Sequence, residues 1–326
     1  MRVAVLGAGA WGTALALVLH RRLHDVVLWG HHAGHLADIE STGRNERYLP
    51  GIEIPNAWIY ESDMAKAIQD CEAVVVAIPS KSVREATGTL AGYRGIIVSV
   101  TKGIDYDTGA TMGSVLGETA PRAGVAALSG PTLALEVARG VPSAIVAGSA
   151  DSEVAHTVQQ MFHSPTFRVY TTSDRLGVEF GGALKNVVAL AAGVGDGLGF
   201  GDNSKAALLT RGIMEIRRLG VACGAQPDTF AGLSGLGDLS VTCFSKLSRN
   251  RSLGERLGRG EKLADVLARS ISVAEGYPTT RAAFRLARER GVYTPIIDET
   301  HAVLYEGKNV AKALQDLVSR ESKPES

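Results

Sequence analysis

The chain has 326 residues, of which 45% are apolar and 21% charged, a composition that excludes disorder over most of its length. At about 150 residues per domain, the length predicts two domains. The 34 basic and 34 acidic side chains cancel, so no overall positive field is present to hold a nucleic acid, and any anion site must be local.

The first half of the chain alternates short apolar runs with longer helical patterns, which is typical of a parallel sheet covered by helices on both faces. We expect strands at 3–6, 26–29, 73–77, 96–99, 125–128 and 144–146. The second half has the pattern of helices, expected near 179–192, 205–223, 248–257 and 277–290. The sequence therefore predicts an α/β fold. We expect an N-terminal Rossmann-type doubly wound sheet in a domain of residues 1–180, followed by an all-α C-terminal domain of residues 181–326.

A glycine-rich turn follows the first expected strand and precedes a helix expected over 13–20. Gly7, Gly9 and Gly12 have the spacing of the dinucleotide-binding fingerprint. Gly7 permits a tight turn, Gly9 lets the backbone approach a pyrophosphate, and Gly12 lets the helix pack closely on the strand. Free N–H groups at the helix N-terminus would face the anion. The turn therefore predicts dinucleotide binding, and a connection without a ligand is the alternative.

The second expected strand ends in Trp29-Gly30-His31-His32, where a site specific for NAD would place a carboxylate on the ribose 2′-hydroxyl. An acidic side chain would repel a 2′-phosphate, whereas a histidine can donate a hydrogen bond to one. We therefore expect NADP(H) or NAD(H) to bind, with NADPH preferred. A metal site at His31, His32 and His35 is the alternative, but no cysteine or carboxylate at ligand spacing accompanies them, and we expect no metal.

The expected helix 179–192 carries a candidate catalytic lysine. One of its faces is formed by Val178, Gly182, Lys185, Ala189 and Ala192. A lysine among small apolar residues must find a partner or shift its pKa, which makes Lys185 a candidate acid or base. An exposed lysine is the alternative. Asp238, on a glycine-bounded turn, could pair with Lys185 and tune its pKa, or could cap a helix.

Ser248 is expected to cap the helix over 248–257. This places Arg249 and the Asn250 amide where backbone N–H groups already favour an anion, so we expect the segment to hold a phosphate monoester. Arg251 cannot point at the same ligand as Arg249, and we expect it to form a solvated surface pair with Glu255.

Two segments of the first half complete the predicted site. Thr101-Lys102-Gly103 and Ser129-Gly130-Pro131-Thr132 each follow an expected strand, and such folds bind ligands at the carboxyl ends of their strands. The Lys102 ammonium could polarise a carbonyl oxygen or hold a phosphate, and a surface lysine is the alternative.

The three cysteines, Cys71, Cys223 and Cys243, are odd in number and far apart, so we expect free thiols in a reducing compartment. We expect Cys243, near Asp238, to be a packed thiol and not a nucleophile, because no neighbouring His or Lys would lower its pKa. No signal peptide is expected, and no membrane span, since the long apolar stretch is broken by glycines. We therefore expect a cytoplasmic protein.

Six segments together resemble, in chain order, the motifs of bacterial NAD(P)-dependent sn-glycerol-3-phosphate dehydrogenase. They are Gly7-Ala8-Gly9-Ala10-Trp11-Gly12-Thr13-Ala14, Thr101-Lys102-Gly103, Ser129-Gly130-Pro131-Thr132, Gly182-Ala183-Leu184-Lys185-Asn186, Gly235-Leu236-Gly237-Asp238-Leu239 and Ser248-Arg249-Asn250-Arg251. The resemblance spans nearly the whole chain. It implies a cytoplasmic, usually dimeric enzyme that interconverts dihydroxyacetone phosphate and sn-glycerol 3-phosphate, the backbone for phospholipid synthesis.

The resemblance also implies roles for single residues. Lys185 is expected to be the general acid or base, with Asp238 and Lys102 as the other catalytic residues. The expected substrate contacts are Lys102, Gly130, Thr132, Lys185, Asn186, Asp238, Ser248, Arg249 and Asn250. The expected cofactor contacts are Gly7, Gly9, Ala10, Trp11, Gly12, His31, His32, Tyr48, Lys102, Ala134, Arg249, Val273 and Glu275. The family often has serine at Ala10 and arginine at His31-His32, so this chain departs from the family pattern at its cofactor site.

We expect a hydride to pass from the nicotinamide to the ketone carbon while the Lys185 ammonium donates a proton to the developing alkoxide. Asp238 would orient Lys185, and Arg249 and Asn250 would anchor the phosphate. Two alternatives remain, since a fold hosts many functions. The first is a related two-domain dehydrogenase of hydroxy acids or imines, and the second is a non-catalytic protein that senses NAD(P).

Overall fold

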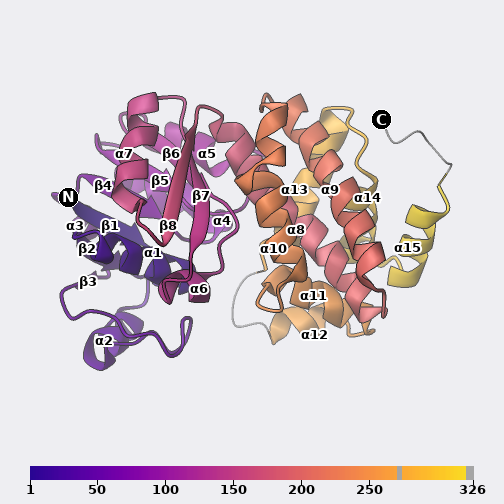
Figure 1. Cartoon of the computed structure of the whole chain (residues 1–326), viewed down its shortest axis with the longest axis horizontal. Helices are drawn as coiled ribbons and strands as arrows, with labels where there is room; N and C mark the ends of the chain where they lie inside the picture. Colours follow the sequence, from indigo (N-terminus) through magenta and orange to yellow (C-terminus); the bar gives the residue numbers. More distant parts are fainter. Residues whose placement is uncertain (270–273, 321–326) are drawn as a thin grey trace.

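The computed structural model describes residues 1–269 and 274–320, with a sheet-containing part and a helical part side by side along the longest axis (Figure 1). The strands are β1 (Arg2–Leu6), β2 (Asp25–Trp29), β3 (Ile59–Glu61), β4 (Ala73–Val76), β5 (Ile96–Ser99), β6 (Gly124–Ser129), β7 (Ser143–Gly148) and β8 (Phe167–Thr172). Among the described residues these eight strands form one sheet in the order β3-β2-β1-β4-β5-β6-β7-β8.

The first six strands run parallel in the 3-2-1-4-5-6 order of a doubly wound nucleotide-binding sheet. The order reverses between β1 and β4, so the turns that follow these two strands meet at one edge of the sheet. The predicted Rossmann-type fold is therefore confirmed.

The predicted parallel direction is wrong for the strand expected at 144–146. That strand is β7, which pairs antiparallel to β6, and β8 then runs parallel to β7. An apolar run indicates that a strand is buried but carries no information about its direction. The sequence analysis also missed β3, which has only three residues, and β8, in which buried Phe167 and Val169 alternate with exposed Arg168 and Tyr170.

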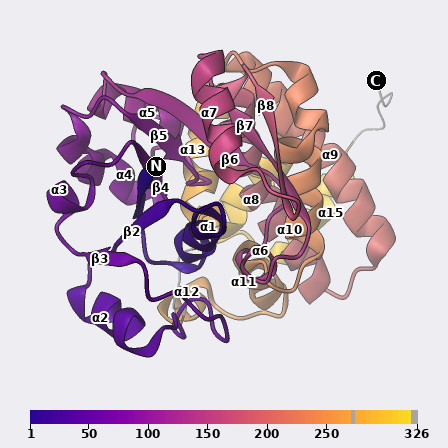
Figure 2. The same ribbon diagram turned by 60° about the vertical axis from the view of Figure 1, so that its left-hand side comes forward.

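Helices cover both faces of the sheet, as Figure 2 shows. They are α1 (Ala10–Arg21), α2 (Ala33–Thr42), α3 (Met64–Ala67), α4 (Ser80–Ala86), α5 (Met112–Thr119), α6 (Ala134–Ala138) and α7 (Ser152–Phe162). Val3 and Val5 of β1 pack in one apolar cluster with α1 and α7, whereas Ala4 and Leu6 pack in another with α4 and α5. This alternation follows from the two-residue period of a strand.

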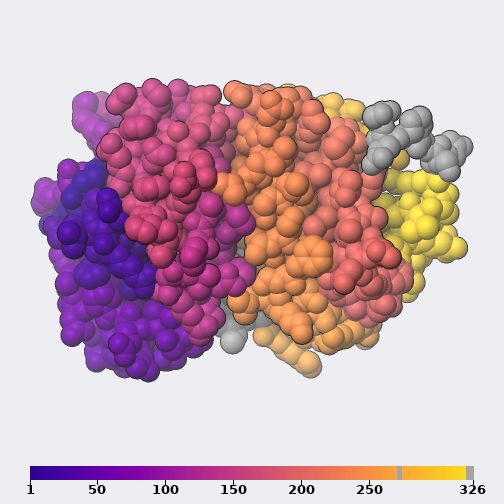
Figure 3. Space-filling model, viewed as in Figure 1, coloured from indigo at the N-terminus to yellow at the C-terminus, as the bar shows by residue number. Residues whose placement is uncertain are grey.

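The rest of the described chain is helical. Its helices are α8 (Arg175–Gly197), α9 (Asp202–Ala222), α10 (Asp238–Phe244), α11 (Arg249–Gly258), α12 (Leu263–Ala268), α13 (Gly276–Glu289), α14 (Pro295–Tyr305) and α15 (Val310–Val318). The five helices predicted along the chain correspond to α1, α8, α9, α11 and α13, whereas α10, α12, α14 and α15 were not predicted. α15 lies at the end of the molecule away from the sheet (Figure 3).

α8 is the central helix of this part. Every residue from 177 to 190 is buried, so the expectation of a single packing face was too narrow. By length and composition α8 could cross a membrane, but 89% of its most apolar window is buried inside the protein, as in a core helix. The predicted division of the chain between residues 180 and 181 stays a prediction. α8 spans that position and also reaches the sheet, where Val178 lies against Gly148 of β7.

α8 and α11 contact each other through their backbones. Gly193 and Gly197 of α8 face Gly254 and Gly258 of α11, each pair being four residues apart and therefore on one side of its helix. A Cβ atom at Gly254 would lie only 1.9 Å from the carbonyl oxygen of Leu190. The two helices can approach this closely only because the contact consists of glycines.

We predict that Gly254→Ala lowers the free energy of unfolding by about 1–3 kcal/mol, because its methyl group overpacks the contact. Equilibrium unfolding in urea measures the change. Gly117→Ala in α5 is the matched control, since a Cβ atom there meets nothing within 4 Å. The control should be neutral or more stable by up to about 1 kcal/mol, given the helix propensity of alanine. Equal stability of the two variants would contradict the predicted overpacking.

Candidate active site

The glycine-rich turn between β1 and α1 lies where the strand order reverses. Gly7 has a φ of +129°, which glycine adopts readily, and a Cβ atom at Gly12 would lie 1.9 Å from the Gly7 carbonyl oxygen. A Cβ atom at Gly9 would meet no atom within 4 Å, so Gly9 borders open space. Gly9 is also the N-cap of α1 and offers no side-chain acceptor. The backbone N–H groups of the first turn of α1 are thus available to an anion.

A buried polar atom beside this turn supports the fit of a dinucleotide. The indole Nε1 of Trp11 is buried and has no hydrogen-bond partner among the described residues, and a buried donor normally has an acceptor. Ala10 and Ala134, the first residues of α1 and α6, pack with Trp11 against the same apolar cluster. Three predicted cofactor contacts therefore border one apolar cluster, and two of them, Ala10 and Trp11, lie in the first turn of α1.

Asn45 holds the glycine-rich turn in place, and the sequence analysis did not identify it as a site residue. Its buried Nδ2 donates hydrogen bonds to the carbonyl oxygen of Ala8, at 3.0 Å, and to Oγ1 of Thr13, at 2.9 Å. The segment between α2 and β3 is thereby fixed against the turn. No sequence pattern marks Asn45, since its partners lie more than 30 positions away.

The two histidines predicted to contact the cofactor follow β2, which pairs with β1. His31 and His32 are exposed, with their ring centres 5.0 Å apart. Nearby, the half-buried Tyr48 packs edge-on against His35 at 5.3 Å. The described residues contain no group of three or more His, Cys, Asp or Glu side chains that could hold a metal ion.

Glu275 brings the helical part to the carboxyl end of β4. Its carboxylate accepts hydrogen bonds from the backbone N–H of Ser80, at 3.0 Å, and from the Ser80 hydroxyl, at 2.6 Å. Ser80 begins α4, which follows β4, the strand next to β1, so Glu275 reaches the edge where the glycine-rich turn lies. Val273, the other cofactor contact predicted in this segment, lies outside the described residues.

The carboxylate of Asp238 lies between two lysine ammonium groups. Its Oδ1 is 2.6 Å from Nζ of Lys185 and its Oδ2 is 2.7 Å from Nζ of Lys102. The Lys185 Nζ also donates to Oγ1 of Thr242 at 2.5 Å, and the Thr242 hydroxyl donates to the backbone oxygen of Asp238. The predicted pairing of Lys185 with Asp238 is present, and Lys102 joins it from the loop after β5.

Burial is the main cause of the shifted pKa of Lys185 in this cluster. Asp238 and Lys185 are 0% and 5% exposed, which excludes the alternative of a surface lysine at position 185. Burial lowers the pKa of Lys185 to about 8, while the charge of Asp238 raises it and that of Lys102 lowers it further. Lys185 can therefore both hold and release a proton near neutral pH, as an acid–base catalyst must.

Thr242 is a residue of the cluster that the sequence analysis missed. The segment predicted as a turn is a π-helical stretch, Leu233–Gly237, that continues into α10 from Asp238. Thr242 lies four residues after Asp238 on α10 and so shares its face. Had this segment been predicted as a helix, the four-residue spacing from Asp238 would have identified Thr242.

The loop after β6 lies beside Lys102. The Lys102 Nζ donates to the Gly130 carbonyl oxygen at 3.1 Å, and the Thr132 hydroxyl donates to the same atom at 3.0 Å. The Ser129 hydroxyl is buried without a partner among the described residues, and a Cβ atom at Gly182 would lie 2.5 Å from it. An unsatisfied hydroxyl at this place leaves a hydrogen bond for a ligand to make.

Ser248 is the predicted N-cap of α11, and its Oγ accepts a hydrogen bond from the Arg251 backbone N–H at 3.2 Å. Asn250 is buried on the same helix. Its Nδ2 donates to Oδ1 of Asn186 at 2.8 Å, and its Oδ1 accepts from the Gly276 N–H at 2.8 Å. Asn186 in turn donates to the Lys102 carbonyl oxygen at 3.1 Å. These bonds link α13, α11 and α8 to the Lys102 loop.

Two arginines of α11 differ from each other in their surroundings. The Arg249 side chain contacts solvent, although nearby protein atoms lower the pKa of its guanidinium and the charge of Glu275 raises it. Arg251 is buried, with its Nε 2.6 Å from Oδ2 of Asp196 and its Nη1 3.1 Å from Glu255. The predicted pairing of Arg251 with Glu255 is therefore present, but the expectation that this pair is solvated was wrong, because Arg251 is buried and Asp196 also reaches it from α8.

The cysteines behave as predicted. Cys71, Cys223 and Cys243 are free thiols. Cys243 is fully buried, and burial raises the pKa of its thiol to about 12, with the charges of Lys185 and Lys205 opposing the shift. A thiol with so high a pKa is not a nucleophile at neutral pH.

Comparison with known proteins gives one consistent result. Residues 2–155 match the family model for the N-terminus of NAD-dependent glycerol-3-phosphate dehydrogenase, and residues 174–315 match the one for its C-terminus. Glycerol-3-phosphate dehydrogenase [NAD(P)+] of Chlorobium phaeobacteroides is 45% identical over 100% of this chain and 99% of its own. The enzyme of the same name from Geobacter sulfurreducens is 46% identical over 99% and 98%. The crystal structure of glycerol-3-phosphate dehydrogenase from Coxiella burnetii superimposes with a TM-score of 0.94 at 34% identity, over 98% of this chain and 99% of that one.

We predict that Asn45→Ala weakens the binding of a nicotinamide dinucleotide on the order of tenfold, because two hydrogen bonds that hold the glycine-rich turn are lost. Titration of nicotinamide fluorescence measures the dissociation constant. Asn56→Ala is the matched control, since Asn56 is exposed in the same connection between α2 and β3. An unchanged dissociation constant for Asn45→Ala would show that the turn keeps its shape without Asn45.

Proposed function

The chain belongs to the NAD-dependent glycerol-3-phosphate dehydrogenase family, and we propose that its cluster of Lys185, Asp238 and Lys102 carries out the reaction of that family. The protein is an NAD(P)-dependent oxidoreductase that interconverts dihydroxyacetone phosphate and sn-glycerol 3-phosphate. The product of reduction supplies glycerophospholipid synthesis. The observation that carries the assignment of roles is the buried Asp238 carboxylate between two ammonium groups.

Lys185 is the proton donor in the direction of ketone reduction. A nicotinamide dinucleotide held at the glycine-rich turn would supply the hydride for the carbonyl carbon. The Lys185 ammonium donates a proton from Nζ to the substrate oxygen as negative charge develops there, and is left as a neutral amine that solvent protonates again. Asp238 and Thr242 hold Nζ in position through the bonds described above. In the direction of alcohol oxidation, the neutral amine accepts the proton.

Lys102 assists the proposed reaction through the positive charge of its ammonium group. Its ammonium lies on the other oxygen of the Asp238 carboxylate, so two positive charges face one negative charge. A cation fixed in a water-poor site stabilises an oxygen on which charge develops. The chain as a whole is neutral, so this excess positive charge is local, and it favours an anionic substrate.

Arg249 and the N-terminus of α11 hold the substrate phosphate. The Arg249 guanidinium reaches solvent beside Ser248, which caps α11, and a helix N-terminus favours an anion. Asn250 keeps one amide hydrogen beyond the bond to Asn186, so it can also donate to a phosphate oxygen. Binding the substrate by its phosphate places the carbonyl group against the lysines.

The residues around the glycine-rich turn hold the dinucleotide. Its pyrophosphate would lie on the N-terminus of α1, with Trp11 and Ala10 beside it. The exposed imidazoles of His31 and His32 would donate to a 2′-phosphate, so NADPH is preferred over NADH and the ratio of their kcat/KM values exceeds one. Glu275 and Ala134 border the same edge of the sheet.

The enzyme is a cytoplasmic homodimer in this proposal. Three free thiols support a reducing compartment, and the family resemblance supports the dimer.

We predict that the enzyme oxidises NADPH with dihydroxyacetone phosphate but not with dihydroxyacetone or a small 2-keto acid. Arg249→Ala should lower kcat/KM for the phosphorylated ketone by about ten- to hundredfold, since a charged hydrogen-bond partner is lost. Arg259→Ala, at the exposed end of the same helix, is the control and should match the unmodified enzyme. Turnover of the keto acid would favour a hydroxy-acid dehydrogenase, and binding of NADPH without turnover would favour a sensor.

We predict that kcat/KM for ketone reduction falls as the pH rises through about 8, because the Lys185 ammonium loses its proton there. Asp238→Asn should move this fall to lower pH, since the Asp238 charge raises the pKa of Lys185. Lys185→Ala should lower the rate by ~10²–10⁴, whereas Lys246→Ala at an exposed position should leave it unchanged. The same pH profile in Asp238→Asn and the unmodified enzyme would exclude Lys185 as the titrating group.

A further inference from the structure

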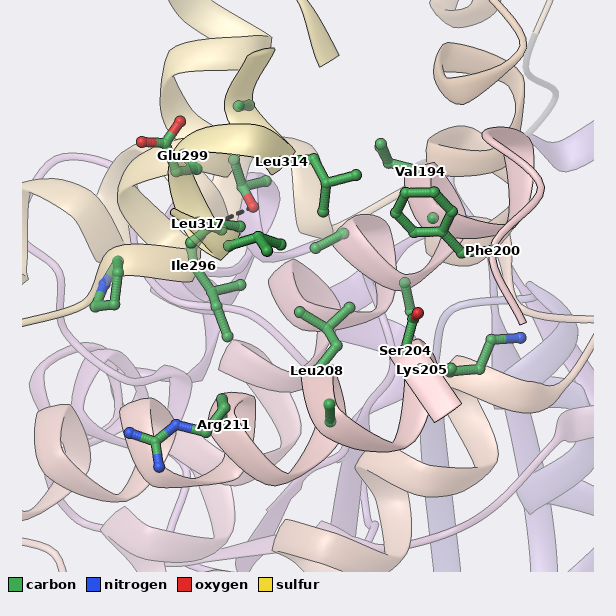
Figure 4. Close-up of a pocket in the computed structure, with 18 of the residues that line it drawn as sticks. Val194, Phe200, Ser204, Lys205, Leu208, Arg211, Ile296, Glu299, Leu314 and Leu317 are labelled. Atoms are coloured by element: carbon green, nitrogen blue, oxygen red, sulfur yellow. Dashed lines mark hydrogen bonds between the residues drawn. The ribbon is translucent and has the colours of Figure 1, made fainter. Parts of the chain in front are cut away.

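A second feature of the helical part lies apart from the lysine cluster. A cavity of about 560 Å³ opens between the C-terminal half of α8 and helices α9, α14 and α15. Figure 4 shows Leu208 of α9, Ile296 of α14, and Leu314 and Leu317 of α15 turned towards this space. Its size and its mainly apolar lining are those of a small-molecule site.

One wall of the cavity is poorly packed against the others. Within α15 only Ala313 is buried, and Leu314 and Leu317 remain half-buried although they face the cavity. Apolar side chains that border an unfilled space lose the dispersion contacts that a close neighbour would make. An apolar occupant would restore those contacts.

One face of α9 gives the cavity a charged end. Leu208, Arg211, Glu215 and Arg218 are three or four residues apart and all line the cavity. The guanidinium groups of Arg218 and Arg320 lie 5.9 and 5.5 Å from the centre of the same ring, that of Tyr293. Two like charges therefore border the same ring at this end, and Arg211 is a third cation on the same lining.

The carboxylates of Glu215 and Glu299, which also line the cavity, already have hydrogen-bond or ion-pair partners of their own. Glu215 accepts hydrogen bonds from the N–H groups of Ile296 and Ile297 at the start of α14. Glu299 pairs with Lys308 at 2.5 Å.

Asp298, on whose carboxyl group the charge of Arg320 acts, pairs with Arg288 at 3.1 Å. Among the described residues, neither Arg211, Arg218 nor Arg320 has a carboxylate within ion-pair distance, and the Arg218 Nε is buried without an acceptor. An apolar cavity that ends in guanidinium groups with no ion pair among the described residues is complementary to a ligand with an apolar chain and an anionic head.

We propose that this cavity binds a single-chain anionic amphiphile, with its alkyl chain among the side chains of α8, α14 and α15 and its head group at Arg211, Arg218 and Arg320. This is a second binding site, independent of the phosphate site at Arg249. A fatty acid and an alkyl phosphate share the required chemistry.

Calorimetric titration of the full-length enzyme with monomeric dodecanoate tests the proposal. One molecule should bind per chain, whereas butyrate, which lacks the chain, and dodecyl maltoside, which lacks the charge, should bind at least tenfold more weakly. Dodecyl phosphate should bind as dodecanoate does. Binding of dodecanoate and the neutral detergent with equal affinity would overturn the role of the guanidinium groups.

Substitutions locate the site. Arg218→Ala or Arg320→Ala should weaken dodecanoate binding about tenfold, and Arg217→Ala should not, because Arg217 is exposed and does not line the cavity. Leu317→Trp should abolish binding by filling the space, with unchanged turnover of dihydroxyacetone phosphate as proof of folding.

Three results would overturn the proposal. One is full binding to Leu317→Trp in an active enzyme. The second is binding to anionic vesicles without binding of free dodecanoate, which would make the face a membrane contact. The third is conversion of a dimer to a monomer by Leu317→Trp together with no dodecanoate binding to the unmodified enzyme, which would make the cavity an interface between copies of the chain.

Discussion

The buried carboxylate of Asp238 is the constraint on which the site depends. A charged group removed from water is strongly unfavourable unless opposite charges and hydrogen bonds compensate it. Here the compensation comes from Lys185 on α8 and from Lys102 on the loop after β5. The carboxylate can be buried only when the sheet-containing part and the helical part are both in place. The same contacts that satisfy it also hold two ammonium groups on one carboxylate, which is the arrangement that the proposed proton transfer uses.

α8, which carries Lys185, also fixes the positions of neighbouring helices relative to the Asp238 cluster. Its backbone lies directly against α11 through glycines, so Lys185 and Asn186 on one helix have a fixed relation to Arg249 and Asn250 on the other. At its beginning, the buried Glu179 carboxylate accepts hydrogen bonds from Gly113 N–H and the Thr111 hydroxyl of the α5 region. The central helix therefore sets the distance between Lys185, the proposed proton donor, and the N-terminal end of α11, the proposed phosphate site. Precise positioning of this kind contributes strongly to rate.

Positive charge in this protein is concentrated at two places, although the chain as a whole is neutral. The net charge is zero, yet cations exceed anions at the lysine cluster and again at the end of the α9–α15 cavity. Both places lie beside apolar walls, where a charge acts more strongly than in water. At the two proposed sites, a neutral chain would hold anionic small molecules without attracting polyanions over its whole surface.

Features that depend on neighbours in sequence were predictable from the sequence alone. The glycine-rich turn, the burial of the first strands, the Ser248 cap and the helix that carries Lys185 each follow from residues within a few positions of one another. The family resemblance linked these segments into one site. The pairing of Lys185 with Asp238 was anticipated because an isolated buried ammonium needs a partner.

Only the tertiary structure decided which distant side chains meet. Asn45 against the glycine-rich turn, Lys102 on Asp238, Asp196 on Arg251, the antiparallel direction of β7 and the cavity under α15 all arise from contacts between segments far apart in the chain. Composition and periodicity determine whether a segment is buried and which face it buries. They do not determine which segment packs against it, because that choice depends on the shape and charge of the whole assembled core.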